Sequence, residues 1–363
     1  MEDKIDIHNT DRVYETALRK FEADEGINPK NRELILKFLW DCKMGKTIKA
    51  RTRKKLGKRR ILKYLFLIKR IAGWLGKPLN EVSQEEMERF VFNIEEGFYK
   101  NKGKDYSERT KLDFKKALQK FYKWMGKPEL VDFIDMTDIP KEVPAITREE
   151  LEKMINSTHE TSVKAALIVL FDGGPRAEEL LNVRLKDLTQ KTHMNDTACY
   201  WINIRHSKTF ARTIPLPLST KQINEWMAEH PDKNNAEAQL FPYTYPALRK
   251  RIRILGERAL KKRLTLHMLR HSSATYWAPK LNRYQLCAKY GWAFSSDMPD
   301  RYIKRKGIIF DEIAEKGDVD QATKLQRENR ILKDDMEKLQ QDYGKIRKAL
   351  EFLMPLIEDM EAE

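Results

Sequence analysis

Long apolar runs are missing from this sequence of 363 residues. No stretch approaches the roughly 18 apolar residues that a membrane-spanning helix needs. The opening residues, MEDKIDIHNTD, are acidic and polar, whereas a secretory signal peptide begins with a basic segment and an apolar core. We therefore expect a cytoplasmic protein without a membrane partner.

Cysteine is also scarce, and the three cysteines lie far apart, at Cys42, Cys199 and Cys287. Without a CxxC pair they indicate neither a disulfide framework nor a structural zinc site. The sequence also lacks a P-loop pattern and a cluster of histidines and carboxylates at metal-ligand spacing. We expect the cysteines to pack as small apolar residues and the protein to need no metal or other cofactor.

Negative charge is absent from one long segment. No acidic residue occurs between Asp41 and Glu81, while basic residues accumulate there, and the whole chain has a formal charge of +15. Such an excess favours a polyanionic partner, because bound Lys and Arg release counterions from phosphates. A solvated helix face or a localisation signal is the alternative. Since the run leads into a helical pattern with aromatic residues, we predict that a folded module binds a phosphate backbone through Arg51, Arg53, Lys54, Lys55, Lys58, Arg59 and Arg60.

Residues 31–136 carry apolar side chains at helical spacing, and strand signals are scarce there. Two predicted helices end in the same pattern, WLGKP at residues 74–78 and WMGKP at 124–128. Glycine suits the position after a helix, and proline prevents its continuation. The segment DIPKEVPAI at residues 138–146 has two prolines between helical patterns and predicts a linker between two domains.

The pattern changes after the linker. Thr147 and Glu150 have the spacing of a capping box, and helical patterns run to the glycine pair at residues 173–174 and restart after it. ACYWINIR and ARTIPLPL have clear strand patterns, and the short polar segment between them predicts a hairpin with Lys208 near its tip. Helical patterns resume in LHMLRHSSATYW and in a short segment around Tyr302.

The last part of the chain, residues 318–363, has a seven-residue period. Two series begin at Leu325 and Asn329, recur every seven positions and alternate by four and three. Charged pairs such as Glu328 with Lys333 match across a parallel helix pair. One amphipathic helix folded back on its own chain is the alternative, and Pro355 interrupts the repeat. We predict a coiled coil over this segment.

The stretch LHMLRHSS concentrates positive hydrogen-bonding capacity. In a helix, His267, Arg270 and His271 project from one face. Elsewhere Arg176 follows the glycine pair and Lys208 lies in the hairpin turn. Alone, each has an ordinary explanation, such as an ion pair or a solvated lysine. Together with a downstream tyrosine, the set suits a phosphoryl-transfer site.

The order of these residues resembles the catalytic domain of tyrosine recombinases, the phage-integrase family. The resemblance covers about residues 147–310 and rests on GGPRAEEL, the hairpin lysine, HMLRH, YGW and the downstream tyrosine. The segment GWAFSSDMPDRYIK is most similar to archaeal-type integrases. The helical module before the linker is similar to the core-binding domain of the family in position and composition.

The resemblance implies a nucleophile and its activation. Tyr302 matches the tyrosine that attacks a phosphodiester, forms a covalent 3′-phosphotyrosyl link and releases a 5′-hydroxyl. Because this link conserves the bond energy for rejoining, no cofactor is implied. Arg176 and Arg270 match the pair that holds the developing phosphate charge, which two guanidinium groups can do bidentately. His267 matches the residue credited with the proton transfer from the tyrosine.

The remaining positions carry implied supporting roles. Lys208 matches the hairpin lysine and is the candidate general acid for the departing 5′-oxygen. Trp292 matches a position that donates a ring N–H to the phosphate. Glu179 matches an acidic position that orients its neighbours, and His271 matches a second histidine with a structural or DNA-contacting role.

The implied fold is mainly α-helical with a small β-hairpin or sheet. We predict an N-terminal segment, a helical core-binding domain that clamps DNA, a linker, an α+β catalytic domain and a C-terminal coiled coil, at residues 1–30, 31–137, 138–146, 147–317 and 318–363. The expected partner is double-stranded DNA in the nucleoid, bound by a dimer on each site and a tetramer in synapsis.

The implied function is site-specific recombination of DNA, in integration, excision or resolution. A non-catalytic dimeric DNA-binding regulator is one alternative, and a DNA-relaxing enzyme like a type IB topoisomerase is another. Most of the chain separates the basic run from the heptads, unlike in a continuous basic-zipper helix, which disfavours the regulator. The heptads favour assembly, and therefore recombination over simple relaxation.

Overall fold

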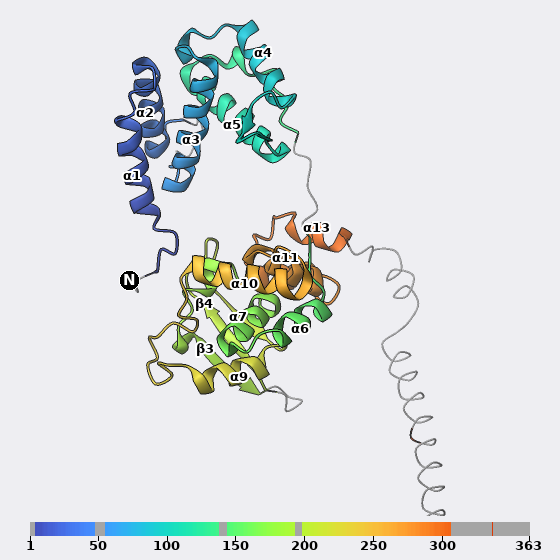
Figure 1. Cartoon of the computed structure of the whole chain (residues 1–363). Helices are drawn as coiled ribbons and strands as arrows, with labels where there is room; N and C mark the ends of the chain where they lie inside the picture. The colour runs from blue at the N-terminus through green and yellow to red at the C-terminus, as the bar shows by residue number, and fades with distance from the viewer. Residues whose placement is uncertain (1–3, 48–54, 138–143, 193–197, 306–335, 337–363) are drawn as a thin grey trace, which may run out of the picture.

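The computed structural model describes residues 4–47, 55–137, 144–192 and 198–305, together with Met336. The predicted coiled coil at 318–363 and the basic residues Arg51, Arg53 and Lys54 lie outside these ranges, apart from Met336 itself. In Figure 1, α1 to α5 gather in one body and the elements from α6 onward in another. Over these residues the chain is mainly helical, as expected, and has two small antiparallel sheets. No helix in the described ranges combines the length and the apolar character needed to cross a bilayer.

The described residues of the first body form helices and one very short hairpin. Its elements are α1 (Thr10–Glu22), α2 (Pro29–Met44), α3 (Lys58–Leu75), η1 (Leu79–Glu81), α4 (Gln84–Glu95), β1 (Lys100–Asn101), β2 (Lys104–Asp105), α5 (Glu108–Met125) and η2 (Pro128–Leu130). Helices α3 and α5 end at Gly76 and Gly126, with φ of 65° and 80°, so the expected glycine caps are confirmed. The hairpin was not expected, because its two-residue strands are exposed and have no apolar alternation.

Aromatic side chains dominate the core of this helical body. Phe38 of α2 lies edge-on against Phe121 of α5, with ring centroids 5.2 Å apart. Tyr14 and Phe21 of α1 belong to the same buried cluster, although they lie in the range predicted as a separate N-terminal segment. The exposed cations of α3 face away from this core, since its buried positions are all aliphatic.

The second body begins at a helix whose cap the sequence predicted. Its elements are α6 (Arg148–Asn156), α7 (Thr161–Asp172), α8 (Ala177–Leu180), η3 (Leu185–Asp187), β3 (Leu188–Thr192), β4 (Ala198–Ile204), β5 (Arg212–Leu216), α9 (Thr220–Glu229), α10 (Tyr245–Leu260), α11 (Leu266–Trp277), α12 (Arg283–Tyr290) and α13 (Met298–Arg305). The side chain of Thr147 accepts from the backbone N–H of Glu150, and the Glu150 carboxylate accepts from the backbone N–H of Thr147. The predicted capping box is therefore confirmed.

Within the described part of this body, the sheet has three antiparallel strands in the order β3-β4-β5. The expected hairpin between β4 and β5 is confirmed, with Ile202 opposite Ile214. Strand β3 was missed, because four of its five residues are exposed and polar and so carry no strand signal. Ile202, Ile204, Ile214 and Leu216 point inward from β4 and β5 and are almost completely buried.

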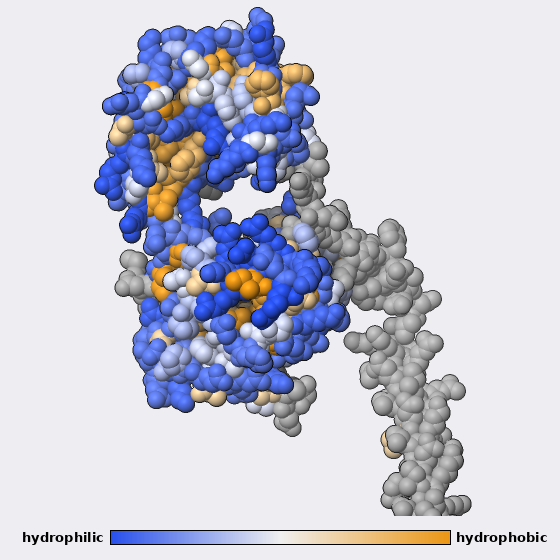
Figure 2. All heavy atoms as spheres, viewed as in Figure 1, coloured by the Kyte–Doolittle hydropathy of each residue, from blue (hydrophilic) through white to orange (hydrophobic). Residues whose placement is uncertain are grey.

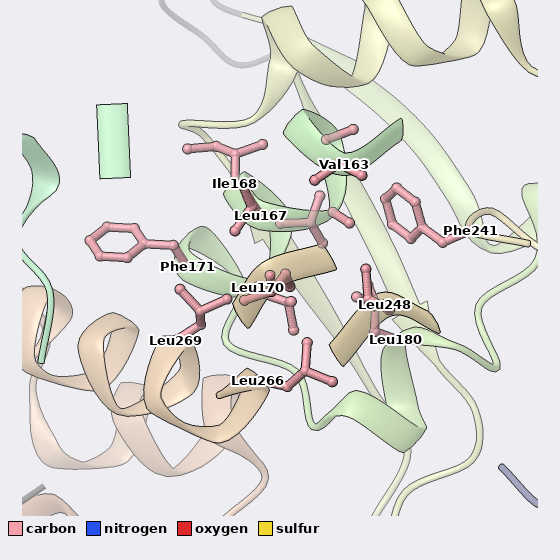
Figure 3. Packing of buried hydrophobic residues seen from close by; sticks show 14 of the residues in the cluster. Val163, Leu167, Ile168, Leu170, Phe171, Leu180, Phe241, Leu248, Leu266 and Leu269 are labelled. Carbon is pink, nitrogen blue, oxygen red and sulfur yellow. The ribbon is translucent and has the colours of Figure 1, made fainter. Parts of the chain in front are cut away.

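Helix α7 is the centre of the second core. All residues from Ala165 to Asp172 are buried, and Figure 3 shows Leu170 and Phe171 close to Leu269 of α11. Leu266 of α11 is buried in the same cluster. Each such leucine contributes about 1.5–3 kcal/mol by leaving water. This packing fixes the rotation of α11, and with it the direction of the His267 and His271 side chains.

Candidate active site

Arg270 is held rigidly inside the second body. Helix α11 begins after Thr265, whose side chain accepts from the backbone N–H of Met268, and Arg270 lies in its second turn with 5% of its surface exposed. Its Nη1 donates to the carbonyl of Gly174 at 2.6 Å, and its Nη2 donates to the carbonyl of Tyr290 at 2.6 Å. Burial and the charge of Arg176 lower the pKa of Arg270 to about 10, so the group remains cationic at neutral pH.

Glu179 connects the arginines of the site. Its Oε1 accepts from Nη1 of Arg176 at 2.7 Å and from Oγ of Ser207 at 2.8 Å. Its Oε2 accepts from the backbone N–H of Arg176 at 2.8 Å and from Nη2 of Arg212 at 2.9 Å. Burial acts to raise the pKa of Glu179, but the hydrogen bonds and charges of Arg212 and Arg176 outweigh it and hold the pKa at about 2. The carboxylate is therefore ionised and hydrogen-bonded to both arginines.

Arg212 is a site residue that the sequence interpretation missed. Its guanidinium is buried and donates to Glu179 and, through Nε, to the carbonyl of Lys289 at 2.9 Å. The strand pattern contained a signal, because Arg212 alternates with Ile214 and Leu216 on the inward face of β5. An arginine at an inward-facing position of a strand needs a buried partner of opposite charge, and here that partner is Glu179.

Two glycines allow the backbone to approach these arginines. Gly174 has a φ of 60°, and a Cβ there would overlap the ring of Tyr290. Gly291 has a φ of 58°, and a Cβ there would lie 2.8 Å from Nη1 of Arg212. Both positions require glycine for conformation and for space. The two tight turns place the Gly174 and Tyr290 carbonyls against Arg270.

Tyr302 lies in a stack of aromatic rings beside Arg270. Its ring is parallel to that of Trp292, with centroids 5.5 Å apart and an interplanar angle of 8°. Trp292 stacks in turn on Tyr290 at 4.8 Å, and the Arg270 guanidinium lies over both of these rings. With 4% of its surface exposed, Tyr302 is a buried residue of α13. The structure thus gathers the predicted tyrosine, tryptophan and arginine in one cluster.

The two histidines of α11 have different neighbours. The hydroxyl of Tyr302 is hydrogen-bonded to Nδ1 of His271. His267 lies edge-on to His271, with ring centroids 4.5 Å apart. Partial burial and the positive charges of Arg270 and Arg176 lower the pKa of His267, although the residue as a whole is exposed. The sequence interpretation linked His267 to the tyrosine, whereas the structure has His271 at the hydroxyl.

Lys208 lies on the bend between β4 and β5 and is exposed. It lines a cavity of about 860 Å³ together with Arg176 and Glu179. The opposite lining comes from the basic run: Lys55, Leu56, Gly57, Lys58, Arg59, Arg60 and Lys63. Figure 2 shows an open hollow between the two bodies with a largely hydrophilic border. Cationic residues that are more than a hundred positions apart in sequence therefore face one space.

The arrangement suits a substrate with a negatively charged phosphate. Arg176, Arg270 and His267 are close enough for the two arginine charges to act on each other and on the histidine. An anion beside them would therefore meet several hydrogen-bond donors. Among the residues that the structure describes, no group of three His, Cys, Asp or Glu side chains could hold a metal ion. The described cysteines are buried thiols, as expected.

Known proteins are similar to this chain in sequence and fold. The model of the phage integrase family matches residues 144–286. Over 221 residues the chain is 25% identical to the tyrosine recombinase XerA of Saccharolobus solfataricus, an alignment that covers 58% of this chain and 70% of the relative.

Solved structures share the fold at low sequence identity. The XerH recombinase in a post-cleavage complex with its palindromic difH substrate has a TM-score of 0.53 and 19% identity, covering 86% of this chain and 98% of that one. A lambda integrase tetramer bound to a Holliday junction has a TM-score of 0.53 and 15% identity. The alignment covers 74% of this chain and 76% of that one.

Proposed function

The chain belongs to the phage integrase family of tyrosine recombinases, and from this we propose that it cleaves and rejoins duplex DNA at a specific site through a 3′-phosphotyrosyl intermediate on Tyr302. The observation that carries the proposal is the stack of Tyr302 on Trp292 directly beside the buried guanidinium of Arg270. A phenol whose ring stack lies against a fixed guanidinium is suited to attack an anionic phosphodiester.

Arg176 and Arg270 hold the scissile phosphate. Both are fixed before DNA arrives, Arg176 by Glu179 and Arg270 by two backbone carbonyls. Charge builds on the non-bridging oxygens as the phosphorus becomes five-coordinate, and guanidinium groups that need no reorganisation stabilise it best. Trp292 supports the tyrosine ring and donates a ring N–H toward the phosphate.

Strand cleavage needs two proton transfers. Oη of Tyr302 forms a bond to phosphorus while the bond from phosphorus to the 5′-oxygen breaks. The phenolic proton passes to a histidine of α11, and Lys208 gives a proton to the leaving 5′-oxygen. Rejoining reverses both transfers, so the protein ends in its starting protonation state without a nucleotide cofactor.

The duplex is bound between the helical body and the catalytic body. Lys55, Lys58, Arg59 and Arg60 share a cavity with Arg176, which supports phosphate contacts on both sides of the DNA. The solved relatives include a lambda integrase dimer on a core site and a tetramer on a Holliday junction. We propose the same states for this chain, with the core-binding domain at residues 31–137, the catalytic domain at 147–317 and the coiled coil at 318–363 pairing protomers.

Covalent capture on DNA tests the function. Purified protein is incubated with sheared genomic DNA of the source organism, denatured, and the DNA attached to protein is sequenced. Wild type should enrich one site, and Tyr302→Phe should enrich none. Binding without an adduct would indicate a regulator, and adducts without strand exchange between two captured sites would indicate a relaxing enzyme. Either result overturns the recombinase proposal.

The role of Lys208 has its own test on the captured site. Replacing the bridging 5′-oxygen by sulfur gives a leaving group that departs as a thiolate and needs no proton. Lys208→Ala should cleave the oxygen substrate about 10²-fold more slowly than wild type and the sulfur substrate at nearly the wild-type rate. An equal defect on both substrates would assign Lys208 to binding.

A further inference from the structure

We propose that His271, and not His267, accepts the phenolic proton of Tyr302 during strand cleavage. The inference rests on the proposed function and names the base of the same site. It assigns a catalytic step to a residue for which the sequence indicated a structural or DNA-contacting role.

The first support is contact with the reacting atom. Nδ1 of His271 is hydrogen-bonded to the hydroxyl of Tyr302, which is the oxygen that attacks the phosphate. A general base must lie within hydrogen-bond reach of the proton it removes. His271 meets this condition within one chain, because α11 and α13 pack against each other.

The second support is that the two histidines have different neighbours. They lie four positions apart on α11, and their rings meet edge-on at 4.5 Å. Burial and the charges of Arg270 and Arg176, the residues assigned to the phosphate, lower the pKa of His267. His267 is therefore suited to donate a hydrogen bond to a phosphate oxygen, while His271 is suited to serve the phenol.

The third support is the enclosure of the phenol. Tyr302 exposes 4% of its surface, and one face of its ring is covered by Trp292. Bulk water therefore has little access to the ring, and a phenol with an ordinary pKa of about 10 loses its proton too rarely at neutral pH to act alone. An imidazole is the side chain most often used as a general base, and that of His271 lies at the hydroxyl.

The proton balance is complete with groups already assigned. Neutral His271 carries its ring proton on Nε2 and takes the phenolic proton on Nδ1, so it becomes a cation as the bond from Oη to phosphorus forms. The bond from phosphorus to the 5′-oxygen breaks, and Lys208 protonates that oxygen. In rejoining, the 5′-hydroxyl returns its proton to Lys208, and His271 returns its proton to the departing phenolate.

A purely positioning role for His271 is the competing explanation, and His271→Asn separates the two. The asparagine Oδ1 can accept a hydrogen bond where Nδ1 did, but it cannot retain a proton at neutral pH. If His271 only positions the phenol, the variant keeps near-wild-type cleavage. If His271 is the base, the variant loses about 10²-fold or more in rate.

The experiment measures single-turnover formation of the covalent adduct on a nicked duplex of the captured site, with DNA affinity measured in parallel. We expect His271→Asn and His271→Ala to bind DNA as wild type does and to form adduct at least about 10²-fold more slowly. Added imidazole should restore part of the rate to His271→Ala. His159→Asn, which removes an exposed histidine elsewhere in the second body, is the matched control and should cleave normally.

The possible outcomes separate this inference from the function itself. Absence of adduct with wild type would overturn the proposed function. Normal adduct formation by His271→Asn, or a slow His271→Ala that imidazole does not accelerate, would overturn the assignment of the base and leave the recombinase proposal standing. A slow His271→Asn together with imidazole rescue of His271→Ala would establish it.

Discussion

Glu179 and Arg212 form a buried ion pair across 33 positions of sequence, with hydrogen bonds of 2.9 and 3.2 Å. Neither side chain has more than 4% of its surface exposed. The pair joins α8, which follows Arg176, to β5, which follows Lys208. Two segments that carry predicted catalytic residues are therefore tied together by one charge pair.

Removing one member of this pair should destabilise the fold. Arg212→Met leaves the Glu179 carboxylate buried with fewer donors, and breaking a buried pair typically costs about 3–5 kcal/mol. Urea denaturation followed by circular dichroism measures the change in the free energy of unfolding. Arg249→Met, at an exposed position of α10, is the control and should stay within about 0.5 kcal/mol of wild type. A similarly small effect of Arg212→Met would contradict the role of the pair.

Acid should lower the unfolding free energy of the protein by protonating the Glu179 carboxylate. The pKa of Glu179 in the folded protein is about 2, below its ordinary value of 4.5, so its ionised form stabilises the fold above pH 4.5. That contribution disappears as the pH falls from 4.5 toward 2. Wild type should therefore lose more unfolding free energy over this interval than Glu179→Gln, which has no such proton to bind. If the unfolding free energies of the two proteins fell by the same amount between pH 4.5 and 2, Glu179 would not be the source of the acid sensitivity.

Gly174 should tolerate no side chain. In Gly174→Ala the new Cβ would overlap the Tyr290 ring and lie 2.8 Å from Oγ of Ser273, in a backbone conformation with positive φ. We expect a loss of about 2 kcal/mol or more in unfolding free energy, and slower cleavage, because the Gly174 carbonyl also holds Arg270.

Gly73 offers the matched comparison for this substitution. It lies inside α3, and an added Cβ would have no other atom within 4 Å, so Gly73→Ala should stabilise the helix by about 0.5–1 kcal/mol. Thermal or urea denaturation measures both variants. Equal effects at the two glycines would show that space around Gly174 is not the constraint.

The basic run should contribute to DNA binding as separate phosphate contacts. Lys55 and Arg60 are exposed and line the cavity with Arg176. If each contacts one phosphate, the double variant Lys55→Ala/Arg60→Ala should reduce the slope of log K against log salt by about 2. Fluorescence anisotropy over a salt series measures this slope. Lys221→Ala, on α9 outside the cavity, should leave it unchanged, and an unchanged slope in the double variant would place the DNA elsewhere.

Much of the local structure could be predicted because its causes are local. The capping box of Thr147 and the glycine ends of α3 and α5 depend on residues within a few positions of each other. The helical placement of His267, Arg270 and His271 follows from their spacing alone. Strand β3 and the hairpin of β1 and β2 escaped prediction because their exposed polar residues carry no apolar pattern.

The sequence by itself determined which chemical groups this protein has and the order in which they occur: two arginines, a hairpin lysine, a histidine pair and a tyrosine. Only the tertiary structure decided which of the two histidines meets the phenol, and that Arg212 reaches Glu179. The physical reason is that these contacts join separate elements. Their geometry depends on how α11, α13 and β5 pack around a shared core, which no local spacing specifies.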